Sequence, residues 1–206
     1  MNNILEGKLV RLVAANSEKD AETTARWSRD SEYARLLDSD PARVNSVSQA
    51  KEGIKKWMEN DDPHSFGFMI RARADDRLIG FVGLGGISWT HGDAWIGIGI
   101  GEREYWGKGY GTDAMRTLLQ FAFAELNLHR VSLNVFEYNP RAIRSYEKAG
   151  FTIEGRVRGC LNRDGKRYDA FWMGILREEW ERAVFSVQNS VFSQQSTEHR
   201  TLNTEH

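Results

Sequence analysis

The N-terminal third of the chain has the hydrophobic pattern of one short strand followed by two helices. The apolar run K-L-V-R-L-V-A at residues 8–14 is typical of a strand. Residues 18–37 then have helical spacing, and D-S-D-P at residues 38–41 ends that helix. A second helix is predicted over residues 48–60, with Ser48 as its N-cap. The side chains expected to face the core from these helices are Trp27, Tyr33, Leu36, Leu37, Ile54, Trp57 and Met58.

The rest of the chain alternates between the strand period of two and the helix period of 3.6. Strands are predicted at residues 65–71, 78–84, 94–100, 131–136, 151–158 and 168–176. Residues 112–126 form an amphipathic helix, and residues 140–149 form another, with Asn139 as N-cap, Pro140 in the first turn and Gly150 after its end. The Asp-Gly pair within R-D-G-K at residues 163–166 favours a tight hairpin between the last two strands.

The element order, β-α-α-β-β-β-α-β-α-β-β, interleaves strands with helices and therefore predicts a mixed sheet with helices on its faces. A length of 206 residues suits one domain. We place that domain at residues 1–184, because the composition becomes polar and aperiodic beyond it. Residues 185–206 are predicted to be a flexible polar tail.

The composition excludes several classes of function. A net charge of −1 gives no basic field for nucleic acid or an anionic membrane. One cysteine and five scattered histidines provide neither a disulfide framework nor metal-ligand spacing, so no metal is expected. The chain has no apolar run of the ~20 residues that a membrane span needs, and its first residues do not resemble a signal peptide. We therefore expect a soluble cytoplasmic protein.

The stretch A-W-I-G-I-G-I-G at residues 94–101 contains glycine at every second position near its end. Glycine weakens a strand, so its repetition needs a reason. Because side chains alternate between the two faces of a strand, the isoleucines would lie on one face and leave the other bare. A narrow ligand would then be able to lie directly against the backbone.

The glycines continue in W-G-K-G-Y-G-T at residues 106–112, which leads directly into the amphipathic helix. Free N–H groups at a helix start, with the positive end of the helix dipole, bind phosphate, and Lys108 adds a charge there. The spacing of Gly107, Gly109 and Gly111 matches neither the dinucleotide fingerprint nor the P-loop. A groove for a thin arm that ends at a phosphate cradle suits coenzyme A.

A second motif, N-P-R-A-I-R-S-Y-E-K-A-G-F, occupies residues 139–151. Tyr146 follows Asn139 by two helical turns, so both lie on roughly one face of the helix. Spacing alone leaves two interpretations of Tyr146 open, a core aromatic and a functional group. Taken with the glycine loop, this segment resembles the GNAT N-acetyltransferases, over roughly residues 5–180. The segments Y-W-G-K-G-Y-G-T and N-V-F-E-Y-N-P-R-A are similar to the RimJ/RimL-type branch.

The resemblance implies a mixed, mostly antiparallel sheet of about seven strands, flanked by about four helices and splayed between the fourth and fifth strands. It also implies acetyl transfer from acetyl-CoA to an amine, with Tyr146 as the acid that protonates the departing thiolate. Trp106 stands where the family usually has Gln or Arg. The residues implied in cofactor binding are Ile98, Gly99, Ile100, Trp106, Gly107, Lys108, Gly109, Tyr110, Gly111, Thr112, Asn139, Arg141 and Arg144.

The catalytic base is less defined, because Trp95 stands where many family members have a glutamate. Glu137 is the first substitute, followed by Asp93 and His91, and a water chain is an alternative. An acidic group around residues 30–40 is either a binding site for a cationic amine or a solvated face. The acceptor is expected to be a protein N-terminus, a polyamine or another small amine. A non-catalytic acyl-CoA sensor is the competing hypothesis, and an exposed edge strand is compatible with a homodimer.

Overall fold

The computed structural model describes residues 3–186, and its strands form one seven-stranded sheet in the order β1-β2-β3-β4-β5-β7-β6. Every neighbouring pair is antiparallel except β4 and β5, which are parallel. The strands are β1 (Val10–Val13), β2 (Phe66–Ala72), β3 (Leu78–Ser88), β4 (Asp93–Ile100), β5 (Arg130–Phe136), β6 (Thr152–Arg163) and β7 (Lys166–Leu176). The mixed, mostly antiparallel sheet expected from the sequence is confirmed.

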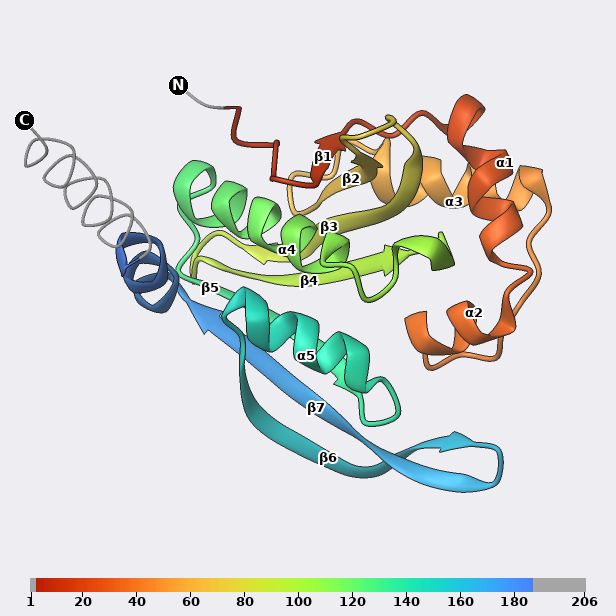
Figure 1. Ribbon diagram of the computed structural model, residues 1–206. Coiled ribbons are helices and arrows are strands. Elements are labelled where there is room, and N and C mark those ends of the chain that lie inside the picture. The colour runs from red at the N-terminus through yellow and green to blue at the C-terminus, as the bar shows by residue number, and fades with distance from the viewer. Residues whose placement is uncertain (1–2, 187–206) are drawn as a thin grey trace, which may run out of the picture.

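The helices cover both faces of the sheet (Figure 1). Those named in the figure are α1 (Ser17–Trp27), α2 (Ser31–Leu37), α3 (Val47–Met58), α4 (Tyr110–Gln120) and α5 (Pro140–Ala149). A π-helical turn, Phe121–Glu125, continues α4, and residues 177–186 are also helical. Residues 187–206 of the expected tail lie outside the described residues. Within the described part, no helix is long and apolar enough to cross a bilayer.

Two apolar clusters divide the core between the faces of the sheet. The larger cluster packs α4 and its π-helical turn against the sheet, with Met115, Leu118 and Phe123 fully buried. The smaller cluster packs α1 and α3 over β2 and β3, around Met69 and Ile54. The helix predicted at residues 112–126 therefore faces the core as expected, although its last turn is π-helical.

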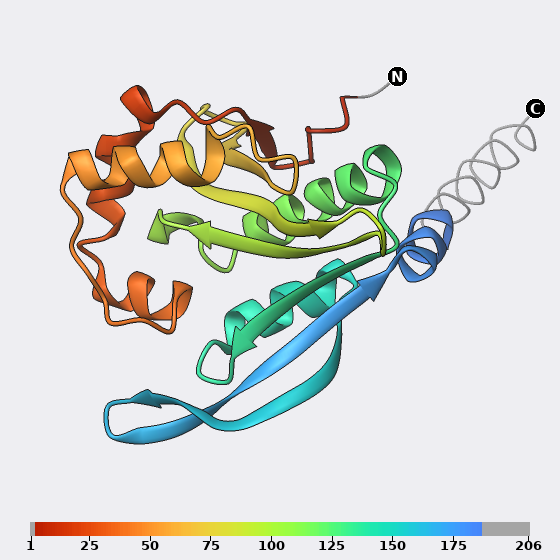
Figure 2. The ribbon, with the colours of Figure 1, turned by 180° about the vertical axis from the view of Figure 1, so that it is seen from behind.

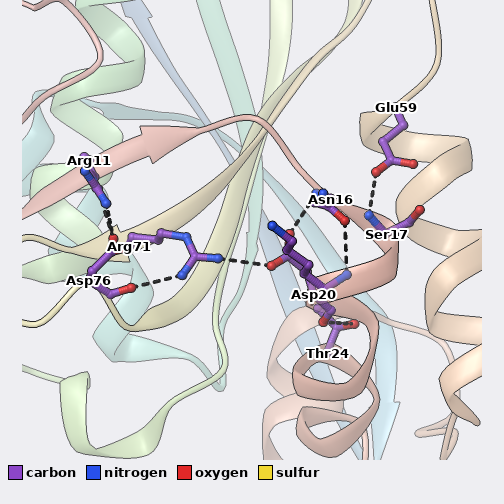
Figure 3. Close-up of polar contacts among 9 residues, drawn as sticks. Arg11, Asn16, Ser17, Asp20, Thr24, Glu59, Arg71 and Asp76 are labelled. Carbon is purple, nitrogen blue, oxygen red and sulfur yellow. Dashed lines mark hydrogen bonds and ion pairs between the residues drawn. The ribbon is translucent and has the colours of Figure 1, made fainter.

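The junction of α1 with the sheet is polar and well connected (Figure 3). The buried carboxylate of Asp20 accepts hydrogen bonds from the Asn16 N–H at 2.8 Å and from Arg71 of β2 at 3.2 Å. The Asn16 side chain caps α1 by accepting from the Lys19 N–H. The Ser17 N–H donates to Glu59 at 2.5 Å, which ties the start of α1 to the end of α3.

Three sequence predictions about the N-terminal helices are wrong. The single helix at 18–37 is two helices, because Asp30 accepts hydrogen bonds from the N–H groups of Glu32 and Tyr33 and so starts a new helix. The N-cap of α3 is Ser46 rather than Ser48, since Ser46 forms a capping box with Gln49. The expected core residues Leu37 and Trp57 are 39% and 68% exposed, because each lies beyond the stripe its helix buries.

The strands β4 and β5 diverge soon after they meet (Figures 1 and 2). Their parallel ladder contains three residue pairs, Asp93 to Trp95 on β4 with Arg130 to Ser132 on β5. Beyond Trp95 the two strands separate, and α5 and α2 lie near the opening. The expected splay is therefore present, and it leaves part of β4 with a neighbouring strand on one side alone.

Candidate active site

A cavity of about 770 Å³ lies in the opening between β4 and β5. Its walls come from β4, β5, the loop after β4, the first turns of α4 and α5, and α2. Of the residues predicted to bind a cofactor or act in catalysis, those that line it are Ile98, Gly99, Ile100, Trp106, Gly107, Gly109, Gly111, Thr112, Asn139, Arg141, Arg144 and Tyr146. One cavity thus gathers residues from both sequence motifs, although the first ends at Thr112 and the second begins only at Asn139.

The backbone of β4 presents an unpaired edge to this cavity. The Gly101 N–H donates to Ile79 of β3, and backbone groups alternate in direction along a strand. The amides of Gly97 and Gly99 therefore face β3, whereas those of Ile98 and Ile100 face the opening. The Ile100 carbonyl confirms this direction, because it accepts the indole N–H of Trp106 at 2.7 Å.

The glycines of β4 do not all leave the strand bare, which corrects the sequence interpretation. A Cβ at Gly99 would lie 2.7 Å from the Tyr33 hydroxyl, and one at Gly101 would lie 2.0 Å from the Trp27 ring. These two glycines allow aromatic side chains of α1 and α2 to pack on the strand. At Gly97 no atom lies within 4 Å of the added Cβ, so the face is open there.

The loop before α4 has the form expected of a phosphate cradle. Gly107 and Gly109 have φ of 71° and 91°, values that favour glycine, and Gly109 is the N-cap of α4. A Cβ at Gly107 would meet no atom within 4 Å, so there is room beside the backbone. The hydroxyls of Thr112 and Ser145 lie 2.8 Å apart and join the first turn of α4 to α5. The free N–H groups of this turn suit a pyrophosphate.

Trp106 stands where the resemblance implies a Gln or Arg. Its ring does not offer phosphate a polar group itself but packs against the guanidinium groups of two arginines. Its ring centroid lies 3.7 Å from the Arg141 guanidinium carbon and 4.9 Å from that of Arg103. Burial lowers the pKa of Arg141, but an arginine stays charged at physiological pH. The indole therefore places a positive charge of α5 beside the helix entrance.

Further basic residues give this end of the cavity a positive charge. They are Lys8, Arg116, Arg144 and Lys148, in addition to Arg141. Asp113 is the acidic residue of the lining, and its carboxylate already accepts the backbone N–H groups of Lys8, Leu9 and Val10 at 2.7–3.2 Å. The excess of positive charge suits a ligand that carries several phosphates.

Tyr146 lines the cavity from α5 and packs against the larger core cluster. Burial raises the pKa of its phenol to about 12, so the group stays protonated throughout the physiological range. The raised pKa makes the phenol a weaker acid, so the functional interpretation rests on its place in the cavity wall rather than on its acidity.

The side chains of Asn139 and Glu137 are already hydrogen-bonded to other parts of the protein, which limits their availability to a ligand. The Asn139 amide oxygen accepts from the Ala142 N–H at 3.1 Å, and its nitrogen donates to the Leu36 carbonyl at 3.4 Å. Glu137 does not line the cavity: its carboxylate accepts the Asp169 N–H at 2.8 Å and lies 4.0 Å from Arg156. Neither Asp93 nor His91 belongs to the lining.

Lys108 and Tyr110, also predicted to bind the cofactor, are not part of the cavity wall. The Tyr110 ring instead packs edge-on against Tyr105 at 4.8 Å. The sequence analysis missed Tyr33, Asn134 and Ser145 as lining residues. Tyr33 had been assigned to the core, and no local signal shows that its hydroxyl reaches Gly99, 66 positions further on.

The open strand edge, the basic helix entrance and the neutral phenol are the features that the resemblance to the acetyltransferases implies. Comparison with known proteins agrees with this class and identifies the family within it. Residues 10–152 match the model of the Acetyltransferase (GNAT) domain. The chain therefore belongs to the GNAT acetyltransferases, in their RimJ/RimL-like branch.

Individual relatives share much of the chain. It is 29% identical over 165 residues to a Bacillus licheniformis protein described as the uncharacterized N-acetyltransferase p20, covering 79% of this chain and 90% of the relative. It is 35% identical over 107 residues to a spermidine N(1)-acetyltransferase of Vibrio cholerae, covering 52% and 61%. The crystal structure of spermidine N-acetyltransferase from Vibrio cholerae with CoA and spermine has a TM-score of 0.73 at 26% identity, covering 84% of this chain and 98% of that one.

Proposed function

We propose that this chain transfers the acetyl group of acetyl-CoA to a primary amine, by direct attack of the amine within a ternary complex. The unpaired edge of β4, which faces a cavity with a basic rim at one end, is the observation that carries the proposal. Family membership supports it, since the GNAT enzymes use acetyl-CoA and a solved neighbour is bound to CoA. We also propose that the protein is cytoplasmic, as its sequence predicts.

Three groups of residues would hold acetyl-CoA, which supplies an activated thioester carbonyl. The outward N–H groups of Ile98 and Ile100 and the carbonyl of Ile98 would bind the amides of the pantetheine arm, and one N–H would serve as oxyanion donor. The backbone N–H groups of residues 107–112 would bind the pyrophosphate. Arg141 and Arg144 would neutralise the remaining phosphate charge.

Tyr146 is assigned as the general acid. A thiol has a pKa of about 8.5 in water, so protonation helps the thiolate to leave. Tyr146 carries its proton at all working pH values; because burial raises its pKa above that of the thiol, its position in the cavity wall rather than its acidity supports the assignment. No carboxylate is assigned as base, since Glu137 is held outside the cavity by Asp169 and Arg156. The proton of the attacking amine is therefore assigned to solvent at the open face of the sheet.

The first prediction tests the acid. In Tyr146→Phe, kcat should fall about ten- to a thousandfold while the Kd for acetyl-CoA stays unchanged, because acid catalysis is lost and binding is not. Thiol release from acetyl-CoA in the presence of an amine panel measures the first quantity, and calorimetry measures the second. Tyr168→Phe, on β7 outside the cavity lining, is the matched control. Undiminished turnover in Tyr146→Phe would refute the assignment.

The same assay separates the enzyme from the sensor hypothesis. A sensor would bind acetyl-CoA tightly and release no thiol with any amine. A thermal-shift titration with acetyl-CoA should therefore be run beside each turnover measurement. Thiol release that requires an amine would exclude the sensor, and binding without release would contradict catalysis.

A further inference from the structure

Two exposed tryptophans stand together on the sheet face opposite α4 and α5. Trp95 of β4 is 41% exposed and Trp172 of β7 is 50% exposed. Their rings meet edge-to-face, with centroids 5.2 Å apart. Exposed indoles lose contact with water at little cost when a ligand covers them, so such a pair is a candidate binding surface.

Neither tryptophan is part of the cavity wall, but each lies next to a residue that is. Gly97, which lines the cavity, follows Trp95 by two residues and so lies on the same strand face. Asn134, which also lines the cavity, is the register partner of Trp172. The pair therefore lies where the cavity opens on this face of the sheet.

Glycines flank the pair and keep it accessible. The register partner of Trp95 on β3 is Gly85, and that of Trp172 on β6 is Gly155. At Gly85 and Gly97 an added Cβ would meet no atom within 4 Å. The floor beside the rings is therefore backbone, and a flat or bulky apolar group is able to lie there.

The acidic residues around this face are largely neutralised. Arg103 binds both Asp30 and Glu32 before and within α2. The other pairs are Arg35 with Asp164, Arg130 with Glu154, and Arg156 with Asp169 and Glu137. Asp30 and Glu32, the first half of the acidic group predicted at residues 30–40, are therefore not free to bind a cation.

The carboxylates of Asp38, Asp40 and Asp93 form no ion pair within 4.0 Å among residues 3–186. The backbone carbonyls of Asp38 and Asp40 accept the Arg163 guanidinium at 2.7 and 3.2 Å, which places a positive charge beside these two. The third is Asp93, two residues before Trp95; one of its oxygens is buried without a hydrogen-bond partner in the described part of the chain. The pKa of Arg130, its register partner on β5, is raised by the hydrogen bond to Glu154 and further by the charge of Asp93. The face therefore offers at most one acid to an ammonium group, whereas a polyamine needs several.

We propose that the acceptor is a primary amine with a single positive charge, attached to an aromatic or bulky apolar body that packs on Trp95 and Trp172. This inference rests on the proposed function, because it names the amine that would be acetylated. It separates the chain from its solved neighbour with spermine, a molecule with several ammonium groups. Acceptors with one charge and an apolar flank gain contact with the indoles and leave no ammonium without a partner.

The experiment compares three amines at saturating acetyl-CoA by thiol release. Phenethylamine should exceed both n-propylamine and spermidine in kcat/KM by about tenfold, equivalent to about 1.4 kcal/mol, since its ring gains aromatic packing in addition to buried area. In Trp172→Ala, kcat/KM for phenethylamine should fall about tenfold, mainly through KM, while the value for n-propylamine stays within about threefold. Trp172→Phe should retain most of the preference.

Trp57→Ala is the matched control, because Trp57 is an exposed tryptophan of α3 that is absent from the cavity wall. It should leave all three amines unaffected. A preference for spermidine, or an unchanged preference for phenethylamine in Trp172→Ala, would overturn the inference.

Failure of the proposed function gives a different result. Acetyl-CoA would then bind normally and no amine would release thiol. Calorimetric titration of phenethylamine into the CoA-saturated protein still tests the surface in that event. Binding at least fivefold weaker in Trp172→Ala than in the wild type is expected, and equal binding contradicts the proposal.

Discussion

Tyr33 is only 7% exposed, yet its hydroxyl has no hydrogen-bond partner among the described residues. An unpaired buried hydroxyl costs about 1–3 kcal/mol. The group lies over Gly99 in a wall of the cavity, where the missing side chain provides its space. Burial also raises the pKa of this phenol, so it remains neutral.

The second prediction follows from this missing partner. Tyr33→Phe should leave the free energy of unfolding unchanged or raise it by up to about 1 kcal/mol, because no hydrogen bond to the protein is lost. The Tyr138 hydroxyl donates to the Arg35 carbonyl at 3.1 Å. Tyr138→Phe should therefore lower the same quantity by about 0.5–1.5 kcal/mol in urea unfolding. A loss above 1 kcal/mol in Tyr33→Phe would show that its hydroxyl does have a partner.

The third prediction concerns Glu137. Glu137→Gln should keep kcat within about threefold, because an amide oxygen still accepts the Asp169 N–H and the carboxylate takes no part in the reaction. With solvent as proton acceptor, kcat/KM should rise about tenfold per pH unit up to the pKa of the amine, in wild type and variant alike. A hundredfold loss of kcat, or loss of an acidic limb in the pH profile, would restore Glu137 as the base.

At the scale of elements, the start of α4 requires glycine at position 109 for two separate reasons. Gly109 has a positive φ and is the N-cap, so a side chain there both strains the backbone and fills the cradle. Gly53 lies within α3 in open space and has neither constraint. The two positions form a natural pair for the same substitution.

The fourth prediction uses that pair. Gly109→Ala should lower the free energy of unfolding by about 1 kcal/mol and weaken acetyl-CoA binding at least tenfold, because a left-handed backbone is costly for alanine. Gly53→Ala should raise stability by about 0.5–1 kcal/mol and leave binding unchanged. Urea unfolding and a thermal-shift titration measure the two effects. Unaltered acetyl-CoA binding in Gly109→Ala would remove this loop from the cofactor site.

Elements with strong local signals were predictable from the sequence, and those that depend on distant contacts were not. The helix α5 was predicted to the residue, since Asn139, Pro140 and Gly150 mark its ends. The break before α2 was missed, because Asp30 reads equally well as a residue inside an acidic helix. The sequence also did not predict why residue 99 is a glycine, because the reason is the Tyr33 side chain of another element.

The same division holds for the site. Residues of the glycine loop and of α5 were predicted because each motif is local and specific. The tryptophan pair was not, since Trp95 and Trp172 meet only when β4, β5 and β7 are ordered in the sheet. Sheet order is a property of the whole fold, and it sets which exposed residues become neighbours.

For the whole molecule, titrating groups at both ends of the pH scale set the limits of stability. Hydrogen bonds lower the pKa of several carboxyls, among them Asp30 through Arg103, Glu154 through Arg130, and Asp169 through the Gly159 N–H and then Arg156. Stabilisation by these carboxylates is present above the unfolded values of 3.8 and 4.5, and it is lost as the pH falls through the lower folded values.

The fifth prediction combines the lowered pKa values of these carboxyls with the raised pKa values of two tyrosines. Burial raises the pKa of Tyr146 from 10.0 to about 12, and it also raises that of Tyr33. Their stabilisation is complete below pH 10 and is lost as the pH rises toward 12. The free energy of unfolding should therefore be nearly flat from about pH 5 to pH 9 and fall on both sides. Urea unfolding across this range tests the profile, and an alkaline fall that begins well below pH 10 would contradict it.

The three-pair ladder between β4 and β5 has a consequence beyond catalysis. Acetyl-CoA bound along the free edge of β4 would hydrogen-bond to it as a further strand would. This additional pairing would be present while the ligand is bound and would end when it dissociates. Binding to the folded state alone stabilises that state. The lifetime of the chain against cellular proteases should then follow the combined supply of acetyl-CoA and CoA, since both carry the pantetheine arm, and depletion of that supply would shorten it. The metabolic state of the cell would set both how fast this enzyme works and how long it lasts.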